Sequence, residues 1–182
     1  MTLYSSFKLD DLFDVNFVNA DQLTETYSTP FYGEYFVHWP EYQRVARHPS
    51  GVIMGYILGK AEGDGEDWHG HVSALTVAPR FRRLGLADEM MKVLEDTSKY
   101  VSNAFFVDLF VRESNKVAIA MYQQLGYIVY RRVVKYYSSC ASHNEEDALD
   151  MRKAMPRDKF RKISCVLPLA KMSISPNELE WQ

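Results

Sequence analysis

The segment Val77-Ala-Pro-Arg-Phe-Arg-Arg-Leu-Gly-Leu-Ala87 joins a predicted strand to a predicted helix through a basic turn. The unpaired N–H groups and partial positive charge of a helix N-terminus bind phosphate. Gly85 and Ala87 leave room for a close approach, and Arg82 and Arg83 add positive charge beside the anion. The segment therefore predicts a phosphate-binding turn, although a bare Arg-x-x-Gly-x-Ala is more often an ordinary turn with solvated arginines.

Strands and helices surround this turn in a regular order. Helical spacing of apolar residues predicts four helices, over residues 9–19, 30–39, 85–100 and 117–125. Runs rich in Val, Ile and aromatic residues between turn signals predict seven strands, over residues 4–7, 42–47, 52–60, 69–77, 104–111, 127–137 and 149–155. The order predicts an α/β chain with a central mixed, mostly antiparallel sheet of about seven strands flanked by about four helices.

Length and composition indicate one globular domain. The chain has 182 residues, 47% of them hydrophobic and 25% charged, which is enough apolar material for a real core. We expect this domain to span residues 1–155. Residues 156–182 lack a clear period, and we expect this C-terminal tail to wrap the surface or to dock a partner.

Charge, hydropathy and cysteine content exclude several classes of protein. A net charge of -3 offers no basic face for nucleic acid, and no apolar run reaches the roughly eighteen residues of a membrane span. The N-terminus lacks the basic and apolar regions of a signal peptide. Cys140 and Cys165 do not make a disulfide framework, so we expect free thiols in a reducing, cytoplasmic compartment.

A second motif follows about thirty residues after the basic turn: Ser114-Asn115-x-x-Ala118-x-x-x-Tyr122-x-x-Leu125-Gly-Tyr127. Together the two motifs resemble the acetyl-CoA signatures of the GNAT acetyltransferase superfamily, in the family's order and spacing. The resemblance implies a GNAT fold and acetyl-CoA as co-substrate. It also implies the cofactor-binding residues, which are Leu75, Val77, Arg82, Arg83, Gly85, Leu86, Ala87, Asn115 and Tyr122. Within this set, the strand end near Leu75 and Val77 would polarise the thioester carbonyl through a backbone N–H.

Further segments resemble one branch of that superfamily, the catalytic subunits of NatB N-terminal acetyltransferases. They are Leu23-Thr-Glu-Thr-Tyr-Ser-Thr-Pro-Phe-Tyr32, Trp68-His-Gly-His-Val-Ser-Ala-Leu-Thr-Val77, Phe105-Phe-Val-Asp-Leu-Phe-Val-Arg112 and Tyr136-Tyr137. The resemblance implies acetylation of nascent chains that begin Met-Asp, Met-Glu, Met-Asn or Met-Gln. It also implies a helical-repeat auxiliary subunit, which brings the enzyme to the ribosome.

Acyl transfer to an amine needs an acceptor for the amine proton. A protein α-amino group has a pKa of about 7.7 to 8.0, so a weak base is sufficient. His71 is the candidate base, and strand alternation places it on one face with His69 and Ser73. The alternative for His71 is a structural histidine with satisfied hydrogen bonds. We expect no metal, because no third ligand cluster accompanies His69-x-His71.

Tyr122 is the candidate general acid for the departing CoA thiolate. On its own, a tyrosine at this helical spacing is more often a core aromatic, and only the motif favours the catalytic interpretation. Neither cysteine falls in a motif, so the sequence does not indicate a covalent enzyme intermediate.

The NatB resemblance also implies a set of substrate-binding residues: Glu25, Tyr27, Phe31, His71, Ser73, Tyr136 and Tyr137. Glu25 and Tyr27 would hold the peptide N-terminus, and Phe31 would line the methionine pocket. Tyr136 and Tyr137 would form the other wall. The hydrogen bonds from His71 and Ser73 to residue two of the peptide would give His71 two roles. The alternative for the aromatic first loop is plain surface packing.

Two rival functions stay open at this stage. One is a GNAT acetyltransferase for another peptide or a small-molecule amine, although Tyr136 and Tyr137 would narrow the acceptor slot. The other is an inactive acyl-CoA-binding scaffold, which the presence of Asn115 and Tyr122 disfavours. Large apolar residues of the first two predicted helices hint at a partner subunit, although most of them would serve this chain's own core: Phe13, Phe17, Tyr35, Phe36 and Trp39.

Overall fold

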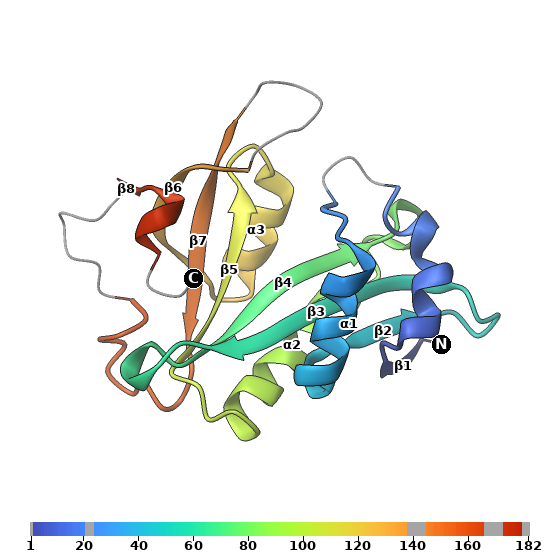
Figure 1. Ribbon diagram of the computed structural model, residues 1–182, viewed down its shortest axis with the longest axis horizontal. Coiled ribbons are helices and arrows are strands. Elements are labelled where there is room, and N and C mark those ends of the chain that lie inside the picture. Colours follow the sequence, from blue (N-terminus) through green and yellow to red (C-terminus); the bar gives the residue numbers. More distant parts are fainter. Residues whose placement is uncertain (1, 21–23, 138–144, 166–172, 180–182) are drawn as a thin grey trace. The chain divides into compact units, whose positions relative to one another are not determined.

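The computed structural model describes residues 2–20, 24–137, 145–165 and 173–179 (Figure 1). The chain forms two compact units. The first contains residues 1–60 and 72–101, and the second contains residues 61–71 and 102–182. The strands β3 (Ile53–Glu62) and β4 (His69–Val77) each contribute residues to both units.

The first unit contains four neighbouring strands in the order β1-β2-β3-β4. The strands β1 (Leu3–Ser6) and β2 (Arg44–Arg47) pair in the antiparallel sense, and β2 pairs with β3 in the same sense. Two α-helices belong to this unit, α1 (Thr29–His38) and α2 (Leu86–Tyr100). The buried side chains of α1 pack against those of β3 around Phe7, so this helix is held on the sheet by an apolar core.

The second unit is built on the strand order β5-β7-β6-β8. Its elements are β5 (Phe106–Arg112), α3 (Lys116–Gln124), β6 (Ile128–Tyr137), β7 (Glu146–Ala154) and β8 (Ser173–Ile174). β7 pairs in the antiparallel sense with both β5 and β6, whereas β8 runs parallel to β6. The sheet is therefore mixed and mostly antiparallel, as predicted.

The helix predicted over residues 9–19 is wrong in type. The chain forms two 3₁₀ segments here, Leu9–Phe13 and Val15–Phe17. The side chains that pack against the core are Leu12, Val15 and Val18. A 3₁₀ helix has three residues per turn, so residues three apart in sequence share a face. The helical spacing that predicted this helix runs through Leu9, Leu12, Phe13 and Phe17. Of these, Leu12 packs on the core, whereas Phe13 and Phe17 are 81% and 71% exposed.

The numbers of strands and α-helices also differ from the prediction. Among the described residues there are eight strands and three α-helices, against predictions of about seven and about four. The extra strand is β8, whose two residues are too few to produce an alternating pattern in the sequence. The lost helix is the 3₁₀ region. The tail thus contributes a strand to the second unit, and the domain boundary at residue 155 stays a prediction.

Other elements agree with prediction within a few residues. β4 has the predicted bounds, and α2 begins directly after Gly85. β7 begins at Glu146 and not at the predicted residue 149, because its first residues are polar and pair with β6 at an irregular register. Among the residues that the structure describes, no helix combines the length and apolar character that a bilayer crossing requires.

Candidate active site

The predicted phosphate-binding turn lies in the first unit. Gly85 is the N-cap of α2 with a φ of 77°, and Arg83 before it has a φ of 65°. Arg82 donates from Nε to the carbonyl oxygen of Val77 at 3.2 Å, so its side chain folds back on the end of β4. Leu86, the first residue of α2, is buried. The turn presents glycine, two exposed arginines and the open end of a helix.

An aromatic row leads from the loop before α1 into that helix. The Tyr27 and Phe31 rings stack with centroids 4.2 Å apart, and the Phe31 and Tyr35 rings stack at 4.5 Å. Two hydroxyls tie the row to Ser73 of β4. Tyr27 donates to the Ser73 carbonyl oxygen at 3.0 Å, and Tyr35 Oη lies 2.8 Å from Ser73 Oγ. The row is therefore fixed at both ends, and Glu25 lies half-buried just before it.

Helix α3 of the second unit carries the other predicted cofactor residues. Asn115 is its N-cap, and the Asn115 side-chain oxygen accepts a hydrogen bond from Ala118 N at 3.1 Å. That capping bond gives Asn115 a structural role whether or not it binds a cofactor. Tyr122 is buried on the same helix, and burial raises the pKa of its hydroxyl above the usual value. Tyr122 therefore stays protonated near neutral pH.

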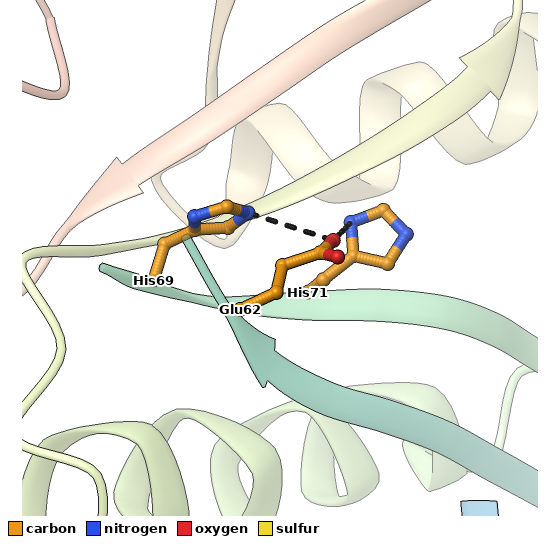
Figure 2. A group of neighbouring side chains, drawn as sticks. All are labelled: Glu62, His69 and His71. Atoms are coloured by element: carbon orange, nitrogen blue, oxygen red, sulfur yellow. Dashed lines mark ion pairs between the residues drawn. The ribbon is translucent and has the colours of Figure 1, made fainter. Parts of the chain in front are cut away.

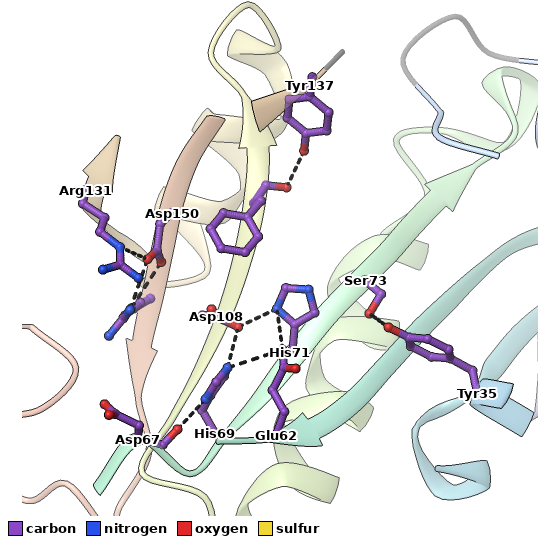
Figure 3. A network of polar contacts seen from close by, with 12 residues as sticks. Tyr35, Glu62, Asp67, His69, His71, Ser73, Asp108, Arg131, Tyr137 and Asp150 are labelled. Carbon is purple, nitrogen blue, oxygen red and sulfur yellow. Dashed lines mark hydrogen bonds and ion pairs between the residues drawn. The ribbon is translucent and has the colours of Figure 1, made fainter. Parts of the chain in front are cut away.

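His71 is bonded to a carboxylate that the sequence analysis did not identify. Its Nδ1 lies 2.8 Å from Asp108 Oδ1, and Asp108 is fully buried on β5 (Figure 3). The His71 side chain retains 11% exposure. The histidine therefore bonds to a buried anion and keeps a small exposed fraction.

His69 and Glu62 complete this group of side chains (Figure 2). His69 donates from Nδ1 to the carbonyl oxygen of Asp67, and its ring stacks on Phe106 at 4.7 Å. Its Nε2 lies 3.5 Å from Asp108 Oδ1 and 3.8 Å from Glu62 Oε1. The ring nitrogens and the Glu62 carboxylate lie within 4.8 Å of one another, close enough to hold a metal ion. The expectation that no third potential ligand accompanies the two histidines is therefore wrong, and Glu62 is that residue.

A ladder of buried charges continues from Asp108 across the second unit. Arg152 on β7 is the cross-strand partner of Asp108 and binds Asp150 through Nε and Nη2. Arg131 on β6 donates to Asp150 from Nε at 2.9 Å. Burial alone would raise the pKa of Asp108, but His69, His71 and Arg152 outweigh it and hold that pKa at about 2. Asp108 is a permanent anion at neutral pH.

Tyr136 and Tyr137 meet this group through Phe110. The Phe110 ring lies 5.6 Å from the His71 ring and stacks on Tyr136 at 4.7 Å. Tyr137 donates to the Phe110 carbonyl oxygen at 3.0 Å, and the Arg112 guanidinium lies 4.1 Å above its ring. Both tyrosines therefore pack on the strand that carries Asp108.

The predicted site residues thus form two sets. The first unit brings together Tyr27, Phe31 and Ser73, and it also carries the phosphate-binding turn. The second unit joins His71 to Tyr136 and Tyr137 through Phe110, and it carries Asn115 and Tyr122 on α3. The functional roles of these residues stay predictions.

Sequence reasoning missed Asp108 and Tyr35. The signal for Asp108 was available, because it is the only charge inside the apolar run Phe105-Phe-Val-Asp-Leu-Phe-Val. A carboxylate in such a strand needs a charged or hydrogen-bonding partner. Tyr35 gave no comparable signal, since an aromatic residue at helical spacing predicts only core packing.

Comparison with known proteins decides the family. Residues 9–127, more than half of the chain, match the model of the acetyltransferase (GNAT) family. The chain belongs to the GNAT acetyltransferase family. This confirms the predicted fold class and an acetyltransferase as the class of enzyme.

Two relatives are similar to this GNAT chain over its full length. The N-terminal acetyltransferase B complex catalytic subunit NAA20 of Arabidopsis thaliana is 52% identical, over 100% of this chain and 99% of the relative. The N-terminal acetyltransferase complex ARD1 subunit homolog of Leishmania donovani is 57% identical, over 100% of both chains. The crystal structure of Chaetomium thermophilum Naa20 in complex with a bisubstrate analogue superposes with a TM-score of 0.88 at 38% identity, over 96% of this chain and 97% of that one.

The depressed pKa of Asp108 predicts a loss of stability in acid. Between about pH 4 and pH 2 the unfolded chain binds a proton at this carboxyl while the folded chain does not, so the free energy of unfolding falls as pH falls. The pKa difference, from 3.8 to about 2, corresponds to roughly 2 kcal/mol. Urea unfolding at several pH values should show a shallower pH slope in Asp108→Asn than in the unmodified chain. Equal pH slopes of the free energy of unfolding in the two chains would contradict the lowered pKa of Asp108.

Proposed function

We propose that this GNAT chain is the catalytic subunit of a NatB-type complex. It transfers acetyl from acetyl-CoA to the α-amino group of nascent chains that begin Met-Asp, Met-Glu, Met-Asn or Met-Gln. The observation that carries this proposal is the similarity over the entire chain to a B complex catalytic subunit. The solved Naa20 structure, similar over 96% of the chain, holds a bisubstrate analogue, which supports acetyl-CoA as the co-substrate.

The basic turn supplies the phosphate contacts in this proposal. The first N–H groups of α2, at Leu86 and Ala87, bind the pyrophosphate, and Arg82 and Arg83 balance its charge. The backbone at Leu75 and Val77, on the last part of β4, polarises the thioester carbonyl. The Asn115 side-chain oxygen caps α3, and its NH₂ group binds the pantetheine arm.

Three groups carry the chemistry. The neutral α-amino nitrogen attacks the thioester carbonyl carbon, and His71 accepts the proton that this nitrogen releases, directly or through one water. The tetrahedral intermediate then collapses with cleavage of the C–S bond. The departing thiolate takes a proton from the Tyr122 hydroxyl, which burial keeps protonated until that moment. No residue is acetylated on the way.

The aromatic row supports a peptide acceptor. Tyr27 and Phe31 stack closely and offer an apolar wall for a methionine side chain, and the bonds to Ser73 keep that wall rigid. Glu25, just before the row, offers a carboxylate for the peptide amino group. Tyr136 and Tyr137 are the further residues proposed to bond the peptide backbone; the Tyr137 hydroxyl, which donates to Phe110, would do so as an acceptor.

Ser73 is well suited to read residue two of the acceptor. Asp, Glu, Asn and Gln share a side-chain oxygen that accepts hydrogen bonds. When the Tyr35 hydroxyl donates to Ser73 Oγ, the Ser73 O–H is available to donate to that oxygen. A leucine at residue two would leave this hydroxyl unpaired, which costs roughly 1–3 kcal/mol if it is buried.

The proposal includes a partner and a location. The auxiliary subunit is a helical-repeat protein that recruits the complex to the ribosome in the cytoplasm. The exposed Phe13 and Phe17 of the first 3₁₀ segments support an apolar docking surface on the first unit. Tyr35, by contrast, is buried in this chain's own core, as expected for most of these aromatics.

An acetyltransferase for another amine is the second candidate. The relatives' names agree on N-terminal acetylation but differ on the complex, because the Leishmania donovani relative is named for the ARD1 subunit. An inactive scaffold has less support, since Tyr122 and the turn at Gly85 are both present. The acceptor specificity therefore decides between these functions.

Substitutions at Gly85 test the phosphate-binding turn. Gly85→Glu and Gly85→Gln are matched, because both add a side chain of the same size at the same positive φ, where no atom lies within 4 Å of the new Cβ. Only glutamate adds a negative charge beside phosphate. Acetyl-CoA should bind to Gly85→Glu at least about tenfold more weakly than to Gly85→Gln in calorimetry, a difference of about 1.4 kcal/mol. Equal acetyl-CoA affinities of the two variants would show that the turn does not bind the phosphates.

Tyr122→Phe tests the general acid. Loss of the hydroxyl should lower kcat by about 10²–10⁴-fold and leave acetyl-CoA affinity unchanged, since the proton is needed only as the thiolate departs. Tyr127→Phe is the matched control, because Tyr127 is also buried and its ring lies 5.9 Å from that of Tyr122. If the two variants have the same kcat, another group protonates the thiolate.

A peptide panel tests the substrate class. Acetyl-CoA turnover is measured on Met-Asp, Met-Glu, Met-Leu and Ser-Glu peptides that are otherwise identical. Met-Asp and Met-Glu should react at least about tenfold faster than Met-Leu, because leucine leaves the polar site at residue two unpaired. A preference for Met-Leu or Ser-Glu would reject the NatB-type proposal and retain only acetyl transfer to an amine.

A further inference from the structure

Glu146 is the first residue of β7, and its two carboxylate oxygens bond to two different parts of the second unit. Oε2 accepts a hydrogen bond from Arg112 Nη1 at 3.1 Å, and Oε1 accepts one from the backbone N–H of Ser114 at 2.8 Å. The Ser114 hydroxyl also donates to Glu146. The hydrogen bonds from Ser114, with a smaller effect of Arg112, outweigh burial and lower the pKa of Glu146. The Glu146 anion therefore bridges the end of β5 and the turn that precedes α3.

The contact with Arg112 leads to Tyr137. Tyr137 is the cross-strand partner of Glu146 on β6. The Arg112 guanidinium lies 4.1 Å from the centre of the Tyr137 ring, close enough for a cation–π contact. The Tyr137 hydroxyl donates to the Phe110 carbonyl oxygen at 3.0 Å (Figure 3). Both contacts place Tyr137 against β5, and the ion pair with Glu146 holds the guanidinium that makes one of them.

The contact with Ser114 leads to Asn115. Ser114 directly precedes Asn115, the N-cap of α3, and the Asn115 backbone N–H donates to the Arg112 carbonyl oxygen at 2.9 Å. A carboxylate at this end of α3 also interacts favourably with the partial positive charge of a helix N-terminus. Glu146 therefore stabilises the turn that carries the Asn115 side chain.

We propose that Glu146 is a positioning residue for both substrates, because it places Tyr137 through Arg112 and places Asn115 through Ser114. The inference rests on the proposed function, in which Tyr137 contacts the acceptor peptide and Asn115 contacts the pantetheine arm. Glu146 itself touches neither substrate in this assignment. All five residues belong to the second unit, so the inference needs no contact between the two units.

Acidic side chains next to Glu146 bond to other groups. Asp147 accepts a hydrogen bond from the backbone N–H of Lys135 at 2.9 Å. Glu145 forms an ion pair with the Lys135 ammonium at the surface, where the Glu145 side chain is 52% exposed. Exposed ion pairs of this kind contribute little to stability. Glu146 differs from both, because its side chain is half-buried and bonds to groups on two other segments.

Glu146→Gln tests the inference. Glutamine keeps the size of the side chain, but it has no charge and its NH₂ group must face one of the two donors, Arg112 or Ser114. We expect the KM for a Met-Asp peptide and the Kd for acetyl-CoA each to rise about tenfold. The kcat with both substrates saturating should fall by less than about threefold, because the reacting groups are unchanged. A merely structural role would instead reduce the amount of folded enzyme and leave KM and Kd unchanged.

Glu145→Gln is the matched control, because it removes the neighbouring carboxylate in the same way. It should leave the peptide KM, the acetyl-CoA Kd and kcat unchanged. Two further variants test the two contacts separately. Arg112→Lys keeps a positive charge for Glu146 but loses the planar guanidinium beside Tyr137, so it should raise only the peptide KM. Ser114→Ala removes a donor to Glu146, so it should raise only the acetyl-CoA Kd, by about threefold.

Two results would overturn the inference. One is a folded Glu146→Gln variant in which the peptide KM and the acetyl-CoA Kd both stay within about twofold of the unmodified chain. The other is an equal rise of both constants in Glu145→Gln. If Glu146→Gln does not fold, the other two variants decide, and unchanged constants in both Arg112→Lys and Ser114→Ala would reject the role of Glu146.

The proposed function can fail separately. If the unmodified chain prefers Ser-Glu peptides, the proposed substrate class is wrong. The KM for the preferred peptide, measured in the same variants beside the acetyl-CoA Kd, still decides whether Glu146 positions both substrates.

Discussion

The Asp108 carboxylate is buried at the centre of β5, where an uncompensated charge would cost several kcal/mol. Charged and polar side chains of the second unit offset this cost. His71 and His69 approach it from β4, and Arg152 lies opposite on β7. Arg152 is buried in turn, and Asp150 and Arg131 extend the compensation to β6. Removing one member would leave its neighbours as unpaired buried charges, so the ladder fixes the register of these strands as well as the ring of His71.

Neighbouring positions of β4 serve the two units in different ways. His71 is bonded to the charges of the second unit, whereas Ser73 is bonded to the tyrosines of the loop before α1 and of α1 itself, in the first. One extended strand thus carries an imidazole and a hydroxyl, each held by residues that lie far away in the sequence. A strand is suited to this task, because side chains two residues apart lie on the same face at a fixed spacing.

Local patterns in the sequence predicted most elements, because they depend on nearby residues. Gly85, a residue type that readily adopts a positive φ, indicated the start of α2. The Val, Thr and small residues of positions 69–77 predicted the bounds of β4. The prediction for residues 9–19 was wrong because Phe13 and Phe17 are spaced like residues on one face of an α-helix. The residues that contact the core, Leu12, Val15 and Val18, instead follow a period of three. Asp108 was missed because its partners are 37 or more residues away, and no local pattern shows which distant charge will compensate a buried one.

The short strand β8 has a consequence for Tyr136 and Tyr137. Ile174 packs in a small core with Val133 and Ala148, and Tyr136, Tyr137 and Phe110 lie against the same core. β8 also covers part of the backbone edge of β6 by parallel pairing. Detachment of β8 would therefore both expose an edge of β6 and loosen the packing of Tyr136 and Tyr137. The packing of Tyr136 and Tyr137 therefore depends on a strand that lies much later in the sequence, so local unfolding of β8 would reach two side chains of β6.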